Sequence, residues 1–231
     1  MPTLFIIVPV RNEAATLPEI LRRVVAAETP GYAKEIIVVD DGSTDASQNV
    51  LQELQPQYGL TLLSHEHNRG KGAAIRTGLA RATGDAILVQ DADLEYDPGD
   101  YPALLGALRP GVDAVYGVRT IKPFGKGYRL YVLGAKLVNG FLNLLFRTHL
   151  SDVYTCYKLI RPSALQKTRL QSNGFEIEAE LTARLLQTGA VIREVPIHYY
   201  PRSFAEGKKI RAKDGLKALG TIIRCRLSKA A

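Results

Sequence analysis

The sequence predicts an α/β protein with a doubly wound, mostly parallel sheet that helices cover on both faces. Strand and helix patterns alternate through the first half of the chain, which is typical of βαβ units. The strand segments are continuous apolar runs, as expected when both faces of a sheet are buried. Polar and acidic residues follow three of these runs, and ligands bind such sheets outside the carboxyl ends of the strands.

The first half contains apolar runs that predict strands, with helical patterns between them. The predicted strands cover residues 4–9, 35–39, 60–63, 86–90 and 112–116. The predicted helices cover about 13–27, 44–56, 71–82 and 100–109. Residues 1–120 therefore form a first half that alternates regularly between the two kinds of element.

The second half, residues 121–231, extends the same domain. Its predicted elements are strands at 156–160 and 190–199 and a helix at 176–187. A chain of 231 residues can form one large α/β domain or two small ones. We find no internal repeat, low-complexity tract or long linker, so we expect one domain over residues 1–231.

Composition excludes several classes of protein. Hydrophobic residues make up 46% of the chain and charged residues 23%, which is ordinary for a globular protein. Cys156 and Cys225 form no C-x-x-C pair, so we expect neither a disulfide framework nor a zinc knuckle. We expect the protein in a reducing compartment. The amino terminus lacks a basic segment before its apolar run, which predicts a strand and not a signal peptide.

The positive charge lies at the carboxyl end. From Arg193 onward the chain carries ten Lys and Arg and three Asp and Glu, so this segment accounts for the whole net charge of +7. A neutral body with a basic tail favours an anionic partner, such as a phosphate, a nucleic acid or an acidic lipid surface. No nucleic-acid-binding module is recognisable, so we expect no nucleic-acid partner.

An acidic strand exit is the most informative feature of the chain. Asp91, Asp93 and Glu95 follow the apolar run 86–89 at a spacing of two, which points their side chains to one side of an extended backbone. Clustered carboxylates favour a divalent cation, and an oxygen-only set suits Mg²⁺ or Mn²⁺. The alternative for a bare Asp-x-Asp is a polar exit from a strand.

A second acidic exit follows the strand at 35–39. Gly42 permits a tight turn, and Ser43 or Thr44 can cap the following helix. Turn and cap chemistry leaves the adjacent Asp40 and Asp41 unexplained. Carboxylates at this place can accept hydrogen bonds from a ribose or a nucleobase, with a purely local turn as the alternative.

The segment 68–74 contains two glycines beside Lys71 but lacks the spacing of a Walker ATPase. Glycines at this place let backbone N–H groups and a helix N-terminus approach a phosphate, with a solvated loop as the alternative. The nearby His65 and His67 have no third ligand in the sequence, so we interpret them as structural.

Two helices have features of membrane-surface helices. Residues 128–146 are mostly apolar and carry one polar stripe, which suits an interfacial helix, although a core helix with one wet edge is the alternative. That stripe consists of Lys136, Asn139, Asn143 and Arg147. No run of about 20 apolar residues is present, so we expect no spanning helix.

The carboxyl-terminal segment predicts a basic amphipathic helix that seeks anionic lipid, with a docked helix as the alternative. Its apolar face consists of Leu216, Leu219, Ile223 and Leu227. Its basic flank consists of Lys217, Arg224, Arg226 and Lys229.

Eight motifs in order resemble those of family 2 glycosyltransferases with the GT-A fold. More closely, they resemble the dolichol- and polyprenyl-phosphate mannosyl- and glucosyltransferases. The motifs span nearly the whole chain, at residues 8–13, 39–45, 68–72, 91–93, 117–119, 151–158, 174–178 and 202–209. The resemblance implies a nucleotide-sugar-binding half at 1–120 and an acceptor and membrane-interface half at 121–231.

The resemblance also implies roles for individual residues. Donor binding is assigned to Pro9, Arg11, Glu13, Asp40, Asp41, Lys71, Asp91 and Ala92. Asp91 and Asp93 would bind Mg²⁺ or Mn²⁺, with Glu95 as a third ligand. Acceptor-phosphate binding is assigned to Arg119, Arg202, Lys208 and Lys209. Asp93, Arg119 and Arg202 would act in catalysis together with Asp152, a base or acceptor-orienting group for which helix capping is the alternative.

The sequence therefore predicts a metal-dependent, inverting hexosyltransferase. We expect it to move a hexose from a nucleotide sugar of the GDP-mannose or UDP-glucose type to a polyprenyl or dolichyl phosphate. We expect it on the cytoplasmic face of a membrane, as a peripheral protein or through a membrane-anchoring subunit. One alternative is a family 2 enzyme with a polysaccharide or other hydroxyl acceptor, and another is a non-catalytic nucleotide-sugar-binding subunit of a membrane complex.

Overall fold

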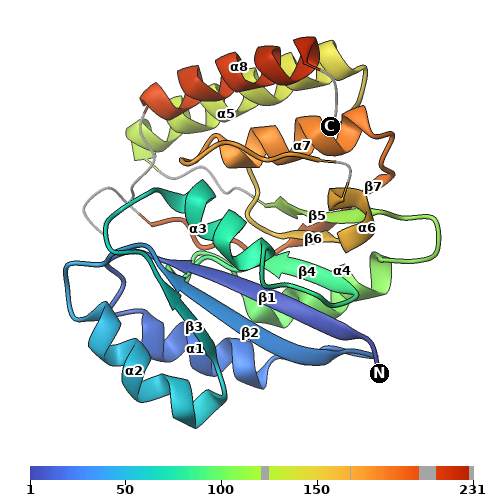
Figure 1. Cartoon of the computed structure of the whole chain (residues 1–231). Coiled ribbons are helices and arrows are strands. Elements are labelled where there is room, and N and C mark those ends of the chain that lie inside the picture. Colours follow the sequence, from blue (N-terminus) through green and yellow to red (C-terminus); the bar gives the residue numbers. More distant parts are fainter. Residues whose placement is uncertain (121–124, 167, 203–211, 229–231) are drawn as a thin grey trace.

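A seven-stranded sheet crosses the middle of the molecule (Figure 1). The computed structural model describes residues 1–120, 125–166, 168–202 and 212–228. In chain order the strands are β1 (Thr3–Val10), β2 (Ala33–Asp40), β3 (Thr61–Ser64), β4 (Ala86–Val89), β5 (Ala114–Arg119), β6 (Lys158–Ile160) and β7 (Ile192–Ile197). Their order across the sheet is β3-β2-β1-β4-β6-β5-β7.

The sheet is mostly parallel, which confirms the predicted fold class. Strands β1 to β4 pair in parallel, and so do β5 and β7. Strand β6 lies antiparallel between β4 and β5, so β4 and β5 run in the same direction. As a result β1, β2, β4 and β5 all end at one edge of the sheet.

Helices cover both faces of the sheet (Figure 1). In the described residues they are α1 (Leu17–Ala26), α2 (Ser47–Tyr58), α3 (Lys71–Leu79), the short η1 (Pro98–Asp100), α4 (Tyr101–Ala107), α5 (Gly125–Phe146), α6 (Pro162–Leu165), α7 (Ile177–Gln187) and α8 (Ala212–Leu227). Helices α1 and α2 lie below the sheet in Figure 1, and α3 and α7 lie above it. Helices α5 and α8 lie side by side as an outer layer over α7.

The core explains why the strands are continuous apolar runs. Along β1, Leu4, Ile6 and Val8 pack into the core on the side of α1, while Phe5 and Ile7 pack into a separate cluster on the side of α3. Both faces of the strand are therefore buried, as predicted from its composition.

Helix α2 begins later than predicted, because side chains before it join two loops. Helix α2 begins at Ser47, and neither Ser43 nor Thr44 caps it, so that prediction is wrong. Asp45 accepts hydrogen bonds from the backbone N–H of Ser47 (2.9 Å) and of Ala14 (3.2 Å). The residues before α2 thus hold the loop after β1, and the helix starts after them.

The polar stripe of α5 is split between the protein and the surface. Asn139 and Asn143 donate to the backbone carbonyl of Leu150 at 2.7 and 2.8 Å, so these two side chains face inward. The exposed face of α5 carries leucines, among them Leu137 and Leu144. The predicted stripe is therefore wrong in part, because the loop after α5 needs buried hydrogen-bond partners.

Helix α8 docks through one apolar face and exposes another. Ala218, Ile222 and Cys225 are fully buried, whereas Leu216 and Leu227 are 72% and 82% exposed. The docked alternative is therefore confirmed, and the helix still presents an apolar surface, so its binding to lipid stays a prediction. Within the described ranges, no helix combines the length and apolar character that crossing a membrane would require.

Candidate active site

A cavity of about 580 Å³ lies at the edge where β1, β2, β4 and β5 end. Parallel strands bring their polar exits to this edge. The predicted site residues that line it are Pro9, Arg11, Glu13, Asp41, Lys71, Asp91, Ala92, Asp93, Glu95, Arg119 and Arg202. Asp40 and Asp152 do not line it, and Lys208 and Lys209 lie outside the described residues.

Asp91 and Asp93 each have a basic partner in the cavity. The Asp91 carboxylate lies 2.7 Å from Nζ of Lys71, and the Asp93 carboxylate lies 3.0 Å from a guanidinium nitrogen of Arg202. Desolvation and the charges of Asp91 and Glu95 raise the pKa of Asp93 to about 7, against the lowering effect of Arg202. The strand exit therefore concentrates negative charge that nearby cations offset only in part.

Both oxygens of Glu95 are bonded to the segment after β7. One accepts from the hydroxyl of Tyr199 and the other from the backbone N–H of Arg202, each at 2.7 Å. Within the described chain, no group of three or more acidic, His or Cys side chains is arranged to hold an ion. The predicted three-carboxylate metal site is therefore not formed, and Glu95 instead joins β4 to the segment after β7.

A two-carboxylate site still fits a divalent cation. The Asp91 and Asp93 side chains are each 20% exposed, line the cavity and offer only oxygen atoms. Mg²⁺ is usually bound by one or two carboxylates plus substrate phosphates, so a full cage of protein ligands is not needed. These two residues are the ones that could hold a metal ion at this edge.

The acids after β2 build the cavity wall. The Asp41 carboxylate accepts the backbone N–H groups of Arg69 (2.8 Å) and Gly70 (2.7 Å) and a 2.7 Å hydrogen bond from Nδ1 of His65. Asp40 accepts from Ser43 and lies behind the wall. The structure thus gives both carboxylates partners within the chain, and their contacts with a nucleoside stay a prediction.

His65 supports the wall from inside. Its Nε2 lies 2.9 Å from the hydroxyl of Thr77 on α3, and its side chain is 4% exposed. The structural interpretation of His65 is therefore confirmed. The ring connects α3 to the carboxylate that fixes the loop at residues 68–70.

The loop after β1 also meets Arg202. The carboxylate of Glu13 accepts two hydrogen bonds from the Arg202 guanidinium, at 3.0 and 3.1 Å, and Arg11 donates to the backbone carbonyl of Asp41 at 3.1 Å. Arg202 therefore bridges Glu13 and Asp93 in the cavity.

Arg119 and Asp152 form a buried bidentate ion pair. Nε and Nη2 of Arg119 lie 2.7 and 2.8 Å from the two oxygens of Asp152, and the Arg119 side chain is 3% exposed. Asp152 contacts Arg119 and does not itself line the cavity, which favours an orienting role over that of a base. The capping alternative is wrong, since no helix begins at Asp152.

Several cavity residues had no predicted role. Glu178 lines the cavity from α7, beside Phe175, Tyr154 and Tyr199. Glu178 belongs to the motif at residues 174–178, but its partners Lys71 and Lys158 lie on α3 and β6. Tyr154 and Phe175 also lie in such motifs, whereas Tyr199 lies in none. The three residues add aromatic surface to the cavity, where the Tyr199 hydroxyl donates to Glu95.

Known structures share this architecture. Glucosyl-3-phosphoglycerate synthase from Mycobacterium tuberculosis, in complex with Mn²⁺, UDP and glucosyl-3-phosphoglycerate, matches with a TM-score of 0.75 and 21% identity, covering 97% of this chain and 80% of that one. The complex of the same enzyme with Mn²⁺, UDP and phosphoglyceric acid matches with a TM-score of 0.76 and 20% identity, covering 98% of this chain and 79% of that one. Its complex with Mg²⁺ and UDP matches with a TM-score of 0.74 and 20% identity, covering 97% of this chain and 79% of that one.

The sheet, its helical layers and these matches define a protein of the GT-A fold class. The model of glycosyl transferase family 2 matches residues 5–169, which is most of the chain. The protein belongs to glycosyl transferase family 2.

Proposed function

We propose that this protein transfers a hexose from a nucleotide sugar to a polyprenyl phosphate at a membrane surface. The observation that carries the proposal is the composition of one cavity, which unites two strand-end carboxylates with Lys71, Arg119 and Arg202. Acids suit a cation and the bases suit phosphate oxygens, so the leaving diphosphate of the donor and the phosphate of the acceptor both find partners.

On the donor side, Asp91 and Asp93 would hold Mg²⁺ or Mn²⁺, and Lys71 would contact the diphosphate. Solved structures of the same fold contain Mn²⁺ or Mg²⁺ together with UDP, which supports this assignment. When bound, the ion supplies Lewis-acid neutralisation of the charge that builds on the leaving nucleoside diphosphate. The nucleoside would then lie beside residues 9–13 and beside Asn68 and Gly70, which line the same cavity.

On the acceptor side, Arg119 and Arg202 line the cavity and are suited to a phosphate because a guanidinium group is always charged and carries five N–H donors. Asp152 fixes the plane of Arg119 through its bidentate contact. A phosphate monoester is largely ionised at neutral pH, since its second pKa is about 6. The cavity can therefore align and stabilise such an acceptor with less need for a strong base, in a single displacement that inverts the anomeric carbon.

The lipid part of the proposal rests on α5 and α8. Exposed apolar side chains lie on both helices, and these are Leu133, Leu137, Leu144, Leu216, Ile223 and Leu227. Helix α8 begins at the cavity, where Lys213 and Asp214 contribute to its lining. An apolar surface that starts at the cavity suits a polyprenyl chain or the membrane that contains it. We place the protein on the cytoplasmic face of that membrane.

A soluble phosphorylated acceptor is the second candidate. The complexes of glucosyl-3-phosphoglycerate synthase with phosphoglyceric acid favour it, because that acceptor also carries a phosphate. The two candidates share the recognition of an anionic phosphate and differ in what the apolar surface of α5 and α8 would bind.

A transfer assay with both acceptors tests the proposal. The purified protein is incubated with Mn²⁺, one of GDP-mannose, UDP-glucose or UDP-N-acetylglucosamine, and either a short polyprenyl phosphate or 3-phosphoglycerate. Mass spectrometry should detect a hexosyl polyprenyl phosphate with one donor. Product from 3-phosphoglycerate alone would replace the proposal with the second candidate. Absence of any product from both acceptors, with donor binding retained, would favour a non-catalytic binding subunit.

A further inference from the structure

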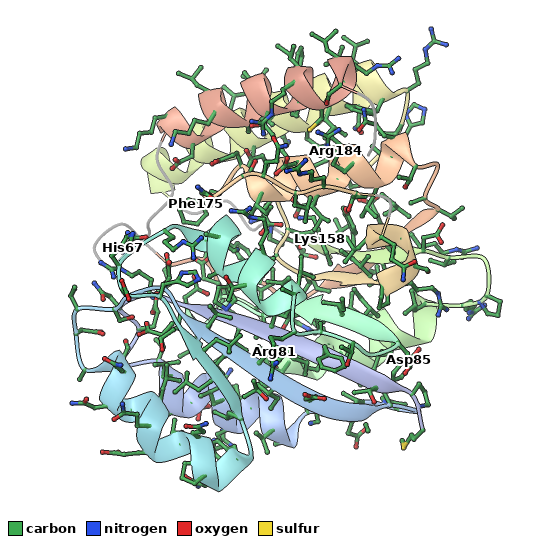
Figure 2. The ribbon with its side chains drawn as sticks, viewed as in Figure 1. His67, Arg81, Asp85, Lys158, Phe175 and Arg184 are labelled. Atoms are coloured by element: carbon green, nitrogen blue, oxygen red, sulfur yellow. The ribbon has the colours of Figure 1, made fainter. Side chains whose placement is uncertain are left out.

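Four side chains of alternating charge lead from the buried core to the cavity wall. Lys158 on β6 has a fully buried side chain, Glu178 on α7 is 6% exposed, Lys71 on α3 is 13% exposed and Asp91 is 20% exposed. Figure 2 shows Lys158 inside the molecule, between the sheet and α7. The exposed fraction thus rises step by step toward the cavity.

Glu178 is the shared member of this series. One of its oxygens contacts Nζ of Lys158, and the other lies 3.1 Å from Nζ of Lys71. Lys158 also donates to the backbone carbonyl of Thr155 at 2.5 Å, which fixes its ammonium group. Glu178 is therefore held from inside and presents its second oxygen toward the cavity.

Lys71 is held between two carboxylates. Its Nζ lies 2.7 and 3.0 Å from the two oxygens of Asp91, in addition to the contact with Glu178. Although burial opposes its charge, Asp91 and Glu178 hold the pKa of Lys71 well above its usual range. A free lysine side chain has many rotamers, and two anchors confine this one to a single place.

We propose that Glu178, itself held by Lys158, is a positioning residue for Lys71. It keeps the Lys71 ammonium beside Asp91, at the place where the diphosphate of the donor binds. This inference rests on the proposed function, since it assigns Glu178 a part in donor binding. It also gives a reason for a charged pair inside the core, where apolar residues of similar volume would pack without the cost of burying charge.

A double-mutant cycle tests the inference. Calorimetry measures the binding of GDP and UDP, each with Mn²⁺, to the wild type and to the variants Glu178→Gln, Lys71→Ala and their combination. Glu178→Gln should weaken binding of the preferred nucleotide about tenfold, the size expected for coupling within one ion-pair network. In the Lys71→Ala background the same change should have almost no effect, because Glu178 acts through Lys71.

Two further variants separate positioning from folding. The pair Glu178→Gln and Lys158→Met removes both buried charges, so it should restore the melting temperature and leave binding weak. Leu185→Ala, which removes a buried side chain from the same helix, should lower the melting temperature and leave nucleotide binding unchanged.

Three outcomes would overturn the inference. Equal weakening by Glu178→Gln in both backgrounds would show that Glu178 acts independently of Lys71. Recovery of affinity in the Glu178→Gln and Lys158→Met protein would show that only stability had been lost. Nucleotide binding that is normal in the Lys71→Ala protein would remove Lys71 from the donor site. A wild type that binds neither nucleotide would instead contradict the proposed function itself.

Discussion

Single residues of this protein act mainly through the partners that hold them. Arg119 is fixed by two hydrogen bonds from its guanidinium to Asp152, and the pair is nearly buried. Removing one partner of a buried ion pair costs about 3–5 kcal/mol, because the other charge is left uncompensated. The roles of both residues can therefore be separated by measuring stability together with activity.

Asp152→Asn should destabilise the protein and raise the KM for the acceptor, because Arg119 loses its orienting carboxylate. The value of kcat at saturating acceptor should change much less. Loss of a general base would lower kcat by about 10²–10⁴-fold. A stable Asp152→Asn protein with such a loss in kcat would contradict the orienting role and return Asp152 to the role of a base.

His198 supplies a pH-dependent contribution to stability. Its Nδ1 lies 2.8 Å from the Asp100 carboxylate, and this hydrogen bond raises the pKa of His198 above its ordinary value. A raised pKa stabilises the folded state fully below the unfolded pKa of about 6.5, and the contribution is lost as pH rises through the folded pKa. The melting temperature of His198→Gln should thus fall below that of the wild type at about pH 6 and approach it at about pH 9. An equal difference at both values would contradict this account.

Residue types at the strand exits were predictable from the sequence, and their partners were not. Asp91, Asp93, Arg119 and Arg202 do lie at one cavity, as their places after strands or in motifs indicate. Asp152 and Arg119 are separated by 33 positions, and their contact depends on how the segment before β6 packs. Glu178 likewise meets Lys71 and Lys158 only because α7, α3 and β6 converge.

At the scale of elements, the start of α3 depends on a close approach between two backbones. Gly70 has φ +100°, and a Cβ added there would lie 2.3 Å from the backbone oxygen of Asn173. Asn173 in turn accepts the backbone N–H of Ala73 at 3.2 Å. The segment before α7 is thereby joined to the N-terminus of α3, which carries Lys71.

Gly70→Ala should lower the free energy of unfolding by more than about 2 kcal/mol, since it adds both a clash and a strained backbone. Gly106→Ala is the matched control, because a Cβ at that position of α4 meets nothing within 4 Å. It should be neutral or stabilise by up to about 1 kcal/mol. Denaturant unfolding compares the two, and similar effects at both glycines would contradict the close packing of α3 on residue 173.

The apolar patterns of the sequence predicted which segments are helices and strands, but they did not predict which side chains of α5 face the protein. A stripe of four polar residues on an apolar helix can face either solvent or a buried loop with the same spacing. The loop after α5 decides the matter for Asn139 and Asn143, because their side chains bond its backbone at Leu150. Such a contact lies between elements and has no periodic signal.

On the scale of the whole molecule, the outer layer of α5 and α8 gives the protein two different sides. The sheet edge carries the charged cavity, while the outer layer, which lies above α7 in Figure 1, exposes leucines. The sequence showed each helix as amphipathic. Their pairing depends on tertiary contacts, through which α5, α7 and α8 share one apolar cluster.

If this outer layer binds a membrane, charges placed on it should weaken binding. Leu137→Glu and Leu227→Glu should each reduce binding to anionic vesicles about tenfold, because burial of a leucine stabilises by about 1.5–3 kcal/mol. Gln52→Glu on the exposed side of α2 adds the same charge elsewhere and should have little effect. Vesicle sedimentation at low salt measures all three, and a wild type that stays unbound would count against the lipid acceptor.

The binding of nucleoside diphosphate with and without Mn²⁺ tests the central claim most directly. Calorimetry on the wild type should show that Mn²⁺ tightens binding by at least about tenfold, since Asp91 and Asp93 would hold the ion together with the phosphates. Asp93→Ala should abolish that gain, and Glu53→Gln, an exposed acid on α2, should retain it. A gain of equal size in the Asp93→Ala protein would contradict the account, because the acids after β4 would then not hold the ion.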